Sequence, residues 1–396
     1  MADIPEIDLT GAEVLRDPFA AYGRVREASP LARIRIPGMG PVWVVTRHED
    51  ARAMLSDPRF GLRGASFLRP DVPGEYLPYL RTMSEMEGSG HRRLRKLVAP
   101  AFTPRRAAEF RPRIEPIVDD LLDGLAGHAG HGTVDLLRHF ARPLPMDVIC
   151  ELVGIPEADR PRWREYGATV VAGSGPGFAE AVPGIVDDAK AAIASRRAEP
   201  ADDLLTDLIR AHEDGDRLSD DELVTMVFHL VIAGQTPTNL IANSVAALLS
   251  HPEQLAALRV GAGGPPQAVD ELIRWCGPTL LTIPRYAEED VELHGTLVHK
   301  GEPITAAVAA VNRDPRAFTE PGRLDLTRGN ASAGHLGFGH GPHFCLGASL
   351  ARVQTEVALT AILRRFPSLS LATPAEDVRA PDPGTWRLTE LPVTLR

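Results

Sequence analysis

The sequence predicts a mainly α-helical protein with a small β region, folded as one domain over residues 1–396. Three observations lead to this expectation. Apolar residues recur at helical spacing in several long stretches, alternating β patterns are short and lie near both ends of the chain, and no repeat or low-complexity segment divides the sequence. The Gly/Pro cluster at residues 261–266 is too short for a domain linker, and we expect it to be a surface connection.

The expected helices are, in chain order, residues 107–125, 186–197, 202–212, 220–250, 252–259, 267–276 and 346–366. The first of them contains Pro112 and Pro116, and proline removes a backbone hydrogen bond from a helix interior. Ser219, with Glu222 three residues later, forms a capping box that starts the long central helix. The expected strands are residues 32–36, 42–46, 297–298, 304–309 and 393–395.

Composition and charge exclude several classes of protein. The net charge of −10 argues against non-specific nucleic-acid binding, because a polyanion needs a basic surface. The N-terminus lacks a secretory signal, and the longest apolar run, residues 223–233, is too short to span a membrane and contains His229. Cys150, Cys276 and Cys345 are too far apart for a zinc-type spacing or a disulfide framework. We therefore expect a cytoplasmic protein that binds neither nucleic acid nor membrane.

The densest chemical signal is the stretch FGHGPHFCLG, residues 338–347, which an amphipathic helix follows directly. The helix dipole and the free backbone N–H groups at a helix N-terminus favour the thiolate form of Cys345. Gly341 and Gly347 allow a bulky planar group to approach the backbone closely. These are the requirements of a thiolate that ligates haem iron. The alternative is a buried structural cysteine.

Phe338, Gly341, His343, Cys345 and Gly347 resemble the haem-binding signature of the cytochrome P450 family, the haem-thiolate monooxygenases. The resemblance covers nearly the whole chain. It implies the cytochrome P450 fold, in which haem b lies between the long central helix and the cysteine loop and helix. It also implies that Cys345 is the axial ligand of the iron, and that its thiolate favours cleavage of the dioxygen bond.

Two further motifs take their meaning from this resemblance. Glu271 and Arg274 resemble the family's structural Glu-x-x-Arg pair, with Arg323 as the third partner, although alone such a pair is usually a surface salt bridge. His91 and Arg95, four residues apart on one helix face, resemble the donors that bind the haem propionates. The haem-contacting residues that the resemblance implies are His91, Arg95, Arg285, Phe338, Gly339, His343, Cys345 and Gly347.

Arg92, Arg93 and Lys96 belong to the same basic segment and are expected to point outward. A basic patch on an acidic protein is a candidate docking site for an acidic electron carrier. By analogy with the family, the carrier would be a ferredoxin, reduced by NAD(P)H through a ferredoxin reductase. The alternative is that the patch only keeps the protein soluble.

The central helix departs from the family at its functional motif. The family carries A-G-x-acid-Thr here, and Ala233 and Gly234 match its first two positions. Thr236 and Pro237 then stand where the acid and the alcohol organise proton delivery. Pro237 should open the helix beside Ala233 and Gly234, leaving room for dioxygen and water. Thr238 is expected to hold a water of the proton relay, unless its hydroxyl bonds back to the helix.

Position along the chain also suggests a substrate pocket and a lid. The proposed pocket residues are Phe67, Leu68, Val170, Leu281, Ile283, Trp386 and Leu388. The stretch GSGPG at residues 173–177 is either a lid hinge or an ordinary loop.

The expected function is the oxidation, most simply the hydroxylation, of a small molecule in natural-product tailoring, with the substrate free or tethered to a carrier protein. Two alternatives stay open because the acid and the alcohol are replaced. One is a peroxide-driven, oxidative-coupling or rearranging haem enzyme. The other is a non-catalytic haem-binding sensor or partner.

Overall fold

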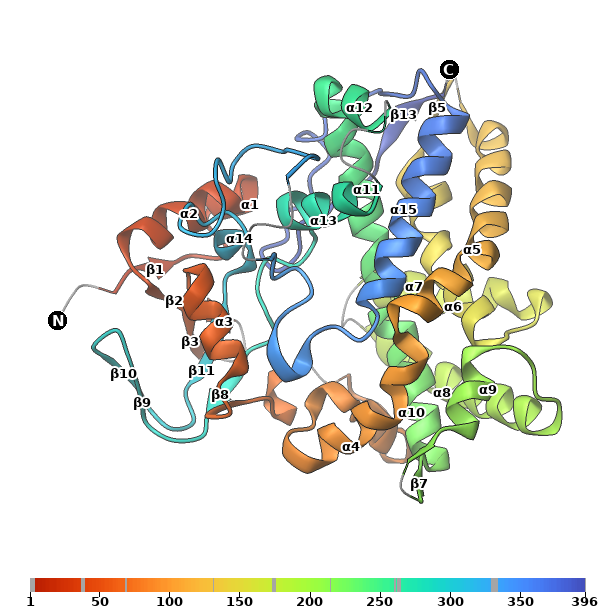
Figure 1. Cartoon of the computed structure of the whole chain (residues 1–396), viewed down its shortest axis with the longest axis horizontal. Helices are drawn as coiled ribbons and strands as arrows, with labels where there is room; N and C mark the ends of the chain where they lie inside the picture. Colours follow the sequence, from red (N-terminus) through yellow and green to blue (C-terminus); the bar gives the residue numbers. More distant parts are fainter. Residues whose placement is uncertain are drawn as a thin grey trace. The chain divides into compact units, whose positions relative to one another are not determined.

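The structure is a computed structural model that describes residues 4–36, 40–67, 70–130, 132–172, 176–213, 215–259, 261, 265–328 and 334–395 (Figure 1). Its contacts divide the chain into two compact units. Unit 1 consists of Met1–Ser66, Asn239–Cys345 and Leu369–Val393, and unit 2 of Phe67–Thr238, Leu346–Ser368 and Thr394–Arg396. Neither unit is a continuous stretch of sequence, so each depends on segments from both halves of the chain.

A six-stranded sheet organises unit 1, in the order β1 (Glu6–Ile7), β2 (Leu31–Ile36), β3 (Gly40–Val45), β11 (Pro303–Ala306), β8 (Arg285–Ala287) and β4 (Phe60–Gly61). β2 and β3 are antiparallel, and β11 joins β3 in parallel. Alternate residues of a strand face opposite sides of a sheet. Ile34 and Val44 accordingly pack with Tyr22, whereas Trp43 and Val45 pack in a separate cluster on the other side.

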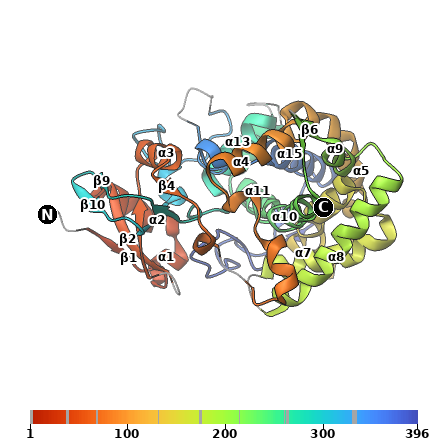
Figure 2. The same cartoon turned by 90° about the horizontal axis from the view of Figure 1, so that it is seen from below.

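Helices and small strand pairs complete unit 1. The helices are α1 (Ala12–Arg16), α2 (Pro18–Ala28), α3 (His48–Ser56), most of α11 (Thr236–Ser250), α12 (Pro252–Arg259), α13 (Pro265–Cys276) and α14 (Val308–Val311). β9 (Val291–Leu293) and β10 (Thr296–Val298) form an antiparallel hairpin that projects beside the sheet in Figure 2. β12 (Ser370–Leu371) pairs with β13 (Pro392–Thr394).

Unit 2 is mainly helical. Its α-helices are α4 (Gly88–Val98), α5 (Pro104–Leu125), α6 (Pro143–Val153), α7 (Arg160–Ala172), α8 (Pro176–Ala198), α9 (Leu204–Arg210), α10 (Asp220–Ala233) and α15 (Ala348–Arg365). The short 3₁₀ segments η2 (Gly74–Leu80) and η3 (Met83–Glu85) precede α4, and η4 (Ala99–Phe102) follows it. β6 (His212–Glu213) and β7 (Asp216–Arg217) form a hairpin before α10.

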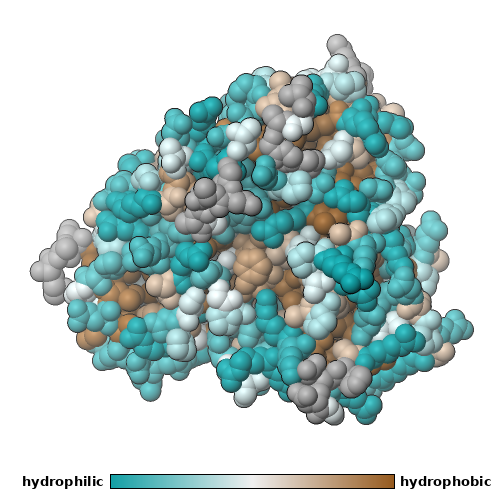
Figure 3. Space-filling view, viewed as in Figure 1, coloured by the Kyte–Doolittle hydropathy of each residue, from teal (hydrophilic) through white to brown (hydrophobic). Residues whose placement is uncertain are grey.

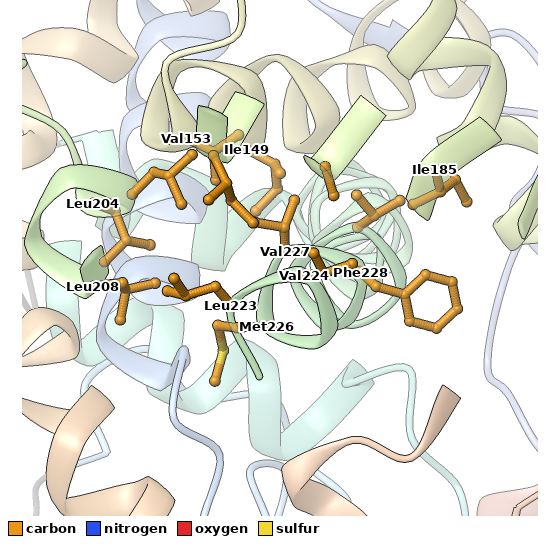
Figure 4. Packing of buried hydrophobic residues seen from close by; sticks show 14 of the residues in the cluster. Ile149, Val153, Ile185, Leu204, Leu208, Leu223, Val224, Met226, Val227 and Phe228 are labelled. Carbon is orange, nitrogen blue, oxygen red and sulfur yellow. The ribbon is translucent and has the colours of Figure 1, made fainter. Parts of the chain in front are cut away.

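The core of unit 2 forms where α6, α8 and α9 meet one side of α10. Figure 4 shows Ile149 and Val153 of α6 close to Leu223 and Val227 of α10, all of them buried. A helix whose apolar residues face several neighbours is stabilised mainly by this burial, at about 25 cal/mol for each Å² removed from water. The core therefore fixes the axis of α10, and with it the start of the motif at Ala233.

Most of the predicted elements are confirmed. Residues 252–259 form α12 with the predicted bounds, and the capping box of Ser219 and Glu222 starts α10. Pro112 and Pro116 both lie inside the continuous helix α5. Two predictions extended too far. The helix predicted at 202–212 ends at Arg210 before the β6–β7 hairpin, and the strand predicted at 304–309 ends at Ala306, because the chain turns there into α14.

The face shown in Figure 3 is mainly hydrophilic, with hydrophobic patches between hydrophilic residues. Within the described ranges, none of the helices combines the length and the apolar character needed to cross a membrane. The residues 173–175 of the proposed lid hinge and the pocket residue Leu68 lie outside the described part of the chain.

Candidate functional site

The loop that carries Cys345 has a defined backbone conformation in unit 1. The N–H of Cys345 donates to the carbonyl oxygen of Phe338 at 2.9 Å, and the N–H of Phe344 donates to the carbonyl of Gly341 at 3.0 Å. Gly339 and Gly341 have φ angles of 72° and 73°, which residues with a side chain rarely adopt. The loop thus closes on itself by backbone hydrogen bonds and leaves Cys345 as an exposed thiol.

The two glycines named in the sequence have different roles. A Cβ on Gly341 would stand 2.6 Å from the carbonyl oxygen of Leu55, so this glycine lets the loop pack against the end of α3. A Cβ on Gly347 would meet nothing within 4 Å, and φ is −81° there. Gly347 therefore leaves open space, as the approach of a planar group requires. An exposed thiol in a fixed loop, two residues before this glycine, fits a haem-thiolate ligand.

The three cysteines differ in their surroundings. Cys150 and Cys276 are buried, and burial raises the pKa of each thiol to about 12. Both thiols are therefore protonated at neutral pH and unsuited to ligating a metal. Cys345 is the exposed cysteine of the three. No cluster of three or more His, Cys, Asp or Glu side chains suited to a metal ion occurs among the described residues.

Glu271 and Arg274 form a buried ion pair on α13. Each residue is only 3% exposed, and the Glu271 carboxylate accepts hydrogen bonds from Nε and Nη2 of Arg274 at 2.7 Å each. Two more donors complete the carboxylate's partners: the N–H of Asp325 at 3.0 Å and Nε of Arg328 at 3.1 Å. The predicted pair is therefore present, and it is buried and fully hydrogen-bonded, unlike a solvated surface pair.

The prediction that Arg323 supplies the third side chain is wrong. Its guanidinium pairs instead with the exposed Glu320 at 3.4 Å. Only its backbone takes part: the carbonyl oxygen of Arg323 accepts from Nη2 of Arg274 at 3.1 Å and from Nη2 of Arg328 at 3.2 Å. The irregular segment around residues 320–328 turns so that Arg328, five residues later, points inward. Arg328 is the third arginine of the cluster.

The predicted propionate donors fall in both units. His91, which is buried, and Arg95, which is partly buried, lie one turn apart on α4 in unit 2. Arg285 lies in unit 1, where it is 5% exposed and donates from Nη1 to the carbonyl of Phe60 at 3.3 Å. His343 is partly buried in the loop that carries Cys345. The structure thus brings together His91 with Arg95, and separately His343 with Cys345.

The basic patch proposed for docking is smaller than expected. Arg92 and Lys96 are exposed on α4. Arg93, by contrast, donates to Asp216 at 2.9 Å and to Glu222 at 2.5 Å, and these hydrogen bonds raise the pKa of its guanidinium. Two carboxylates therefore neutralise Arg93. Its role is to hold α4 to the β6–β7 hairpin and to the start of α10, which corrects the expectation that it points outward.

The central helix is interrupted at its motif, as predicted, but the position of the proline differs. α10 ends at Ala233 and α11 begins at Thr236, so Gly234 and Gln235 form the break. Pro237 is the second residue of the new helix rather than part of a helix interior. The N–H groups of the first turn have no partner within a helix, so proline costs little there. One long helix is thus replaced by two helices.

Gly234 serves packing in unit 2. A Cβ at this position would lie 2.4 Å from the carbonyl oxygen of Leu230 and 2.8 Å from Cγ1 of Ile149 on α6. The face of Gly234 that lacks a side chain is therefore filled by the preceding turn of α10 and by α6. Ala233 and Thr236 are the exposed residues of this segment.

Thr238 does not bond back to the helix. Its side chain is fully buried, and its hydroxyl has no hydrogen-bond partner among the described residues. The carboxamide of Gln235, which is 4% exposed, also has no hydrogen-bond partner among the described residues. It packs against Gly167 of α7, where an added Cβ would lie 2.9 Å from its Oε1. Buried polar groups are normally hydrogen-bonded, so these two side chains could each hold a water or a polar ligand atom at the break.

The proposed pocket residues divide into accessible and buried ones. Ile283 is 45% exposed, and Phe67 and Val170 are partly buried. Leu388 is only 3% exposed and belongs to the buried core of unit 1. Trp386 packs edge-on against Phe19 of α2 with ring centroids 4.9 Å apart. Leu281 packs against the same cluster.

Comparisons with known proteins match this chain to one family. The cytochrome P450 family model matches residues 266–389. The nocardicin C N-oxygenase of Nocardia uniformis subsp. tsuyamanensis is 42% identical over 97% of this chain and 97% of its own. The mycinamicin IV hydroxylase/epoxidase of Micromonospora griseorubida is 41% identical over 94% of this chain and 96% of its own. The solved structure of P450BioI with hexadec-9Z-enoic acid ligated to acyl carrier protein has a TM-score of 0.85 and 35% identity, covering 97% of this chain and 100% of that one.

The fold and the cysteine loop define a haem-thiolate protein. With relatives above 40% identity over nearly its whole length, the chain belongs to the cytochrome P450 family. It is a cytochrome P450 monooxygenase, and the family's prosthetic group is a haem iron.

Sequence reasoning missed two residues that bear on the site. Arg328 gave no signal of its own, because the pattern around Arg323 matched the family motif better. His229 was noted only as a polar residue in an apolar run. Its position on α10, one turn before Ala233, was readable from the helical spacing and marks it as part of the same helix face.

Proposed function

We propose that this monooxygenase hydroxylates a small organic molecule in natural-product tailoring, with Cys345 as the axial ligand of haem b. The observation that carries the proposal is the exposed Cys345 thiol, in a loop fixed by backbone hydrogen bonds, in a chain whose other two cysteines are buried. The printed names of the relatives, a mycinamicin IV hydroxylase/epoxidase and a nocardicin C N-oxygenase, support a natural-product substrate.

His91, Arg95, Arg285 and His343 would hold the propionates. Burial supports this role for His91 and Arg285, because a hydrogen bond to an anionic group is strongest where water is excluded. When bound, the haem supplies dioxygen activation. The protein's own part is to exclude water, to orient the substrate and to deliver protons.

Proton delivery is assigned to water at the helix break. Thr236 and Pro237 cannot titrate near neutral pH, so a proton must arrive through hydroxyl groups and water. The buried, unpartnered hydroxyl of Thr238 supports its role in holding such a water. Replacing Thr238 with Val should raise peroxide release relative to product, measured as the ratio of product to NADPH consumed. Unchanged coupling would exclude this role.

Electrons would come from NAD(P)H through a ferredoxin reductase and a ferredoxin. Arg92 and Lys96, which are exposed, support a smaller docking patch that does not include Arg93. A carrier-tethered substrate is the second arrangement, and the complex of P450BioI with an acyl carrier protein favours testing it.

The test of the ligand is optical. The reduced, carbon monoxide-bound native protein should give a thiolate-haem spectrum. Cys345→Ala should lose that spectrum, and Cys150→Ala, which removes a buried thiol, should keep it. A thiolate spectrum in the Cys345→Ala variant would overturn the assignment. Turnover with peroxide alone, and none with ferredoxin, reductase and NADPH, would favour the peroxide-driven alternative.

A further inference from the structure

His229, which pairs with Ser84, lies on the face of α10 that leads to the break between α10 and α11. Thr225, His229 and Ala233 follow one another at intervals of four residues and are partly buried or exposed, whereas Val224, Val227, Phe228 and Val231 turn into the core of unit 2. Because residues four apart share a helix face, His229 lies one turn from Ala233, about 6 Å along the axis. It is the titratable side chain nearest to the break on this face of α10.

The imidazole of His229 has one partner among the described residues. Its Nε2 lies 3.4 Å from Oγ of Ser84, which belongs to the 3₁₀ segment η3. This distance is at the long limit for a hydrogen bond. Neither side chain makes another hydrogen bond in the described part of the chain, so the imidazole and the hydroxyl keep unused donor and acceptor capacity.

The position of Ser84 is set by a second contact of the same segment. Tyr79, in the adjoining segment η2, donates its hydroxyl hydrogen to Asp221 at the start of α10, at 3.3 Å. The two contacts lie eight residues apart on α10, a little over two turns. The η2–η3 segment is therefore held along α10 at two points, and the Ser84–His229 pair is placed by the fold rather than by a mobile loop.

Among the described residues, the imidazole of His229 has no charged hydrogen-bond partner. Burial lowers the pKa of His229 to about 4, and burial is the one cause of the shift, with no charged group contributing. The imidazole is accordingly neutral near pH 7. A charged ligand group placed here would lose its hydration without gaining a countercharge, which is costly. A neutral oxygen would lose less and would gain a hydrogen bond.

We propose that His229 and Ser84 form a specificity-determining site that binds a neutral oxygen of the substrate, a carbonyl, hydroxyl or ether, and so selects uncharged, oxygenated molecules. This inference rests on the proposed function, because it places the substrate beside Ala233. The imidazole N–H donates to the ligand oxygen, and the Ser84 hydroxyl donates to it or accepts from its O–H. His229 is a positioning residue: it fixes which carbon of the substrate faces the break.

The experiment uses two probes of equal ring size, cyclododecanone and cyclododecane, which differ by one carbonyl oxygen. Their affinities for the haem-loaded protein are measured from the change in the haem absorption on titration. One net hydrogen bond of about 1 kcal/mol corresponds to roughly a fivefold to tenfold preference. We expect the native protein to prefer the ketone by this factor, and His229→Leu to reduce the preference below about twofold.

Three further variants separate specificity from stability. His229→Gln keeps a donor and an acceptor and should keep the preference. Ser84→Ala removes one of the two partners and should reduce it. Tyr79→Phe removes the contact with Asp221 that helps to place Ser84, and should reduce the preference less than Ser84→Ala does. Equal affinity of the native protein for both probes, binding of neither, or a full preference in both His229→Leu and Ser84→Ala overturns the proposal.

Failure of this inference is distinguishable from failure of the proposed function. A normal thiolate-haem spectrum in every variant, combined with no ketone preference, would reject the role of His229 and keep the haem-thiolate assignment. A native protein without that spectrum would reject the assignment of Cys345.

Discussion

The cluster around Glu271 allows the sharpest test of the structure, because two arginines five residues apart are predicted to behave differently. Arg328→Ala removes the charge-assisted hydrogen bond of 3.1 Å to the buried Glu271 carboxylate, and also the donors to three backbone carbonyls. A hydrogen bond to a charged group contributes about 1.5–3 kcal/mol. We expect a loss of about 2–3 kcal/mol in the free energy of unfolding. Arg274→Ala should cost more, about 3–5 kcal/mol, because it leaves the carboxylate without its bidentate partner.

Arg323→Ala is the matched control. The Arg323 side chain is 60% exposed, and Glu320 is its one ion-pair partner among the described residues. Its backbone carbonyl, which the substitution keeps, accepts from Arg274. The expected change is within about 0.5 kcal/mol. Urea unfolding of the haem-loaded proteins, followed by circular dichroism at matched haem content, measures all three. If Arg323→Ala destabilises as much as Arg328→Ala, the placement of these two side chains is wrong.

Three shorter predictions follow. Gly341→Ala should lower haem retention, and it should lower the free energy of unfolding by about 2 kcal/mol or more, because φ is 73° at Gly341 and a Cβ would meet a backbone oxygen. Gly347→Ala should change the free energy of unfolding by less than about 0.5 kcal/mol. Thermal unfolding of the apoprotein compares the stability of the two variants. Iodoacetamide at pH 8 should alkylate only Cys345 in the folded apoprotein, as mass spectrometry of peptides would show, because the other two thiols have pKa values raised to about 12. Burial lowers the pKa of His229 to about 4 in the folded protein. Between pH 6.5 and 4 the imidazole is therefore neutral in the folded protein and protonated in the unfolded chain. Stability should therefore fall by up to about 3 kcal/mol between pH 6.5 and 4, and His229→Leu should flatten that part of the profile.

Local signals in the sequence predicted α5, α9, α10, α12, α13 and α15, but they gave no prediction for α1, α2, α6 or α7. The capping box at Ser219 and the proline that begins α12 are short-range features, and both fix a helix start in the structure. The strand predicted at 304–309 failed beyond Ala306, because a run of Ala and Val residues suits a strand and a helix equally. Tertiary context decides between them, and the sequence pattern does not contain it.

The errors at the candidate site share a physical cause. Motif spacing identified Glu271 and Arg274, because both lie on one regular helix where residues three apart are neighbours. Motif spacing failed for the third arginine, because the segment between Glu320 and Arg328 is irregular. In such a segment the number of residues between two positions does not predict the direction in which a side chain points. Leu388 was assigned by position along the chain alone, and its burial depends on contacts that a single sequence does not reveal.

The break in the central helix shows how much of a motif can be read without its surroundings. From the sequence, Pro237 was expected to open one long helix beside Ala233 and Gly234, leaving room for dioxygen and water. In the structure the proline stands in the first turn of a new helix, where its missing N–H costs little. Gly234 is required because Ile149 of α6 occupies the place of its side chain. Packing within unit 2 therefore stabilises the break, whether or not a ligand is bound. A helix that is already interrupted needs no ligand energy to open, so its exposed residues Ala233 and Thr236 and the buried hydroxyl of Thr238 are in place before the substrate arrives.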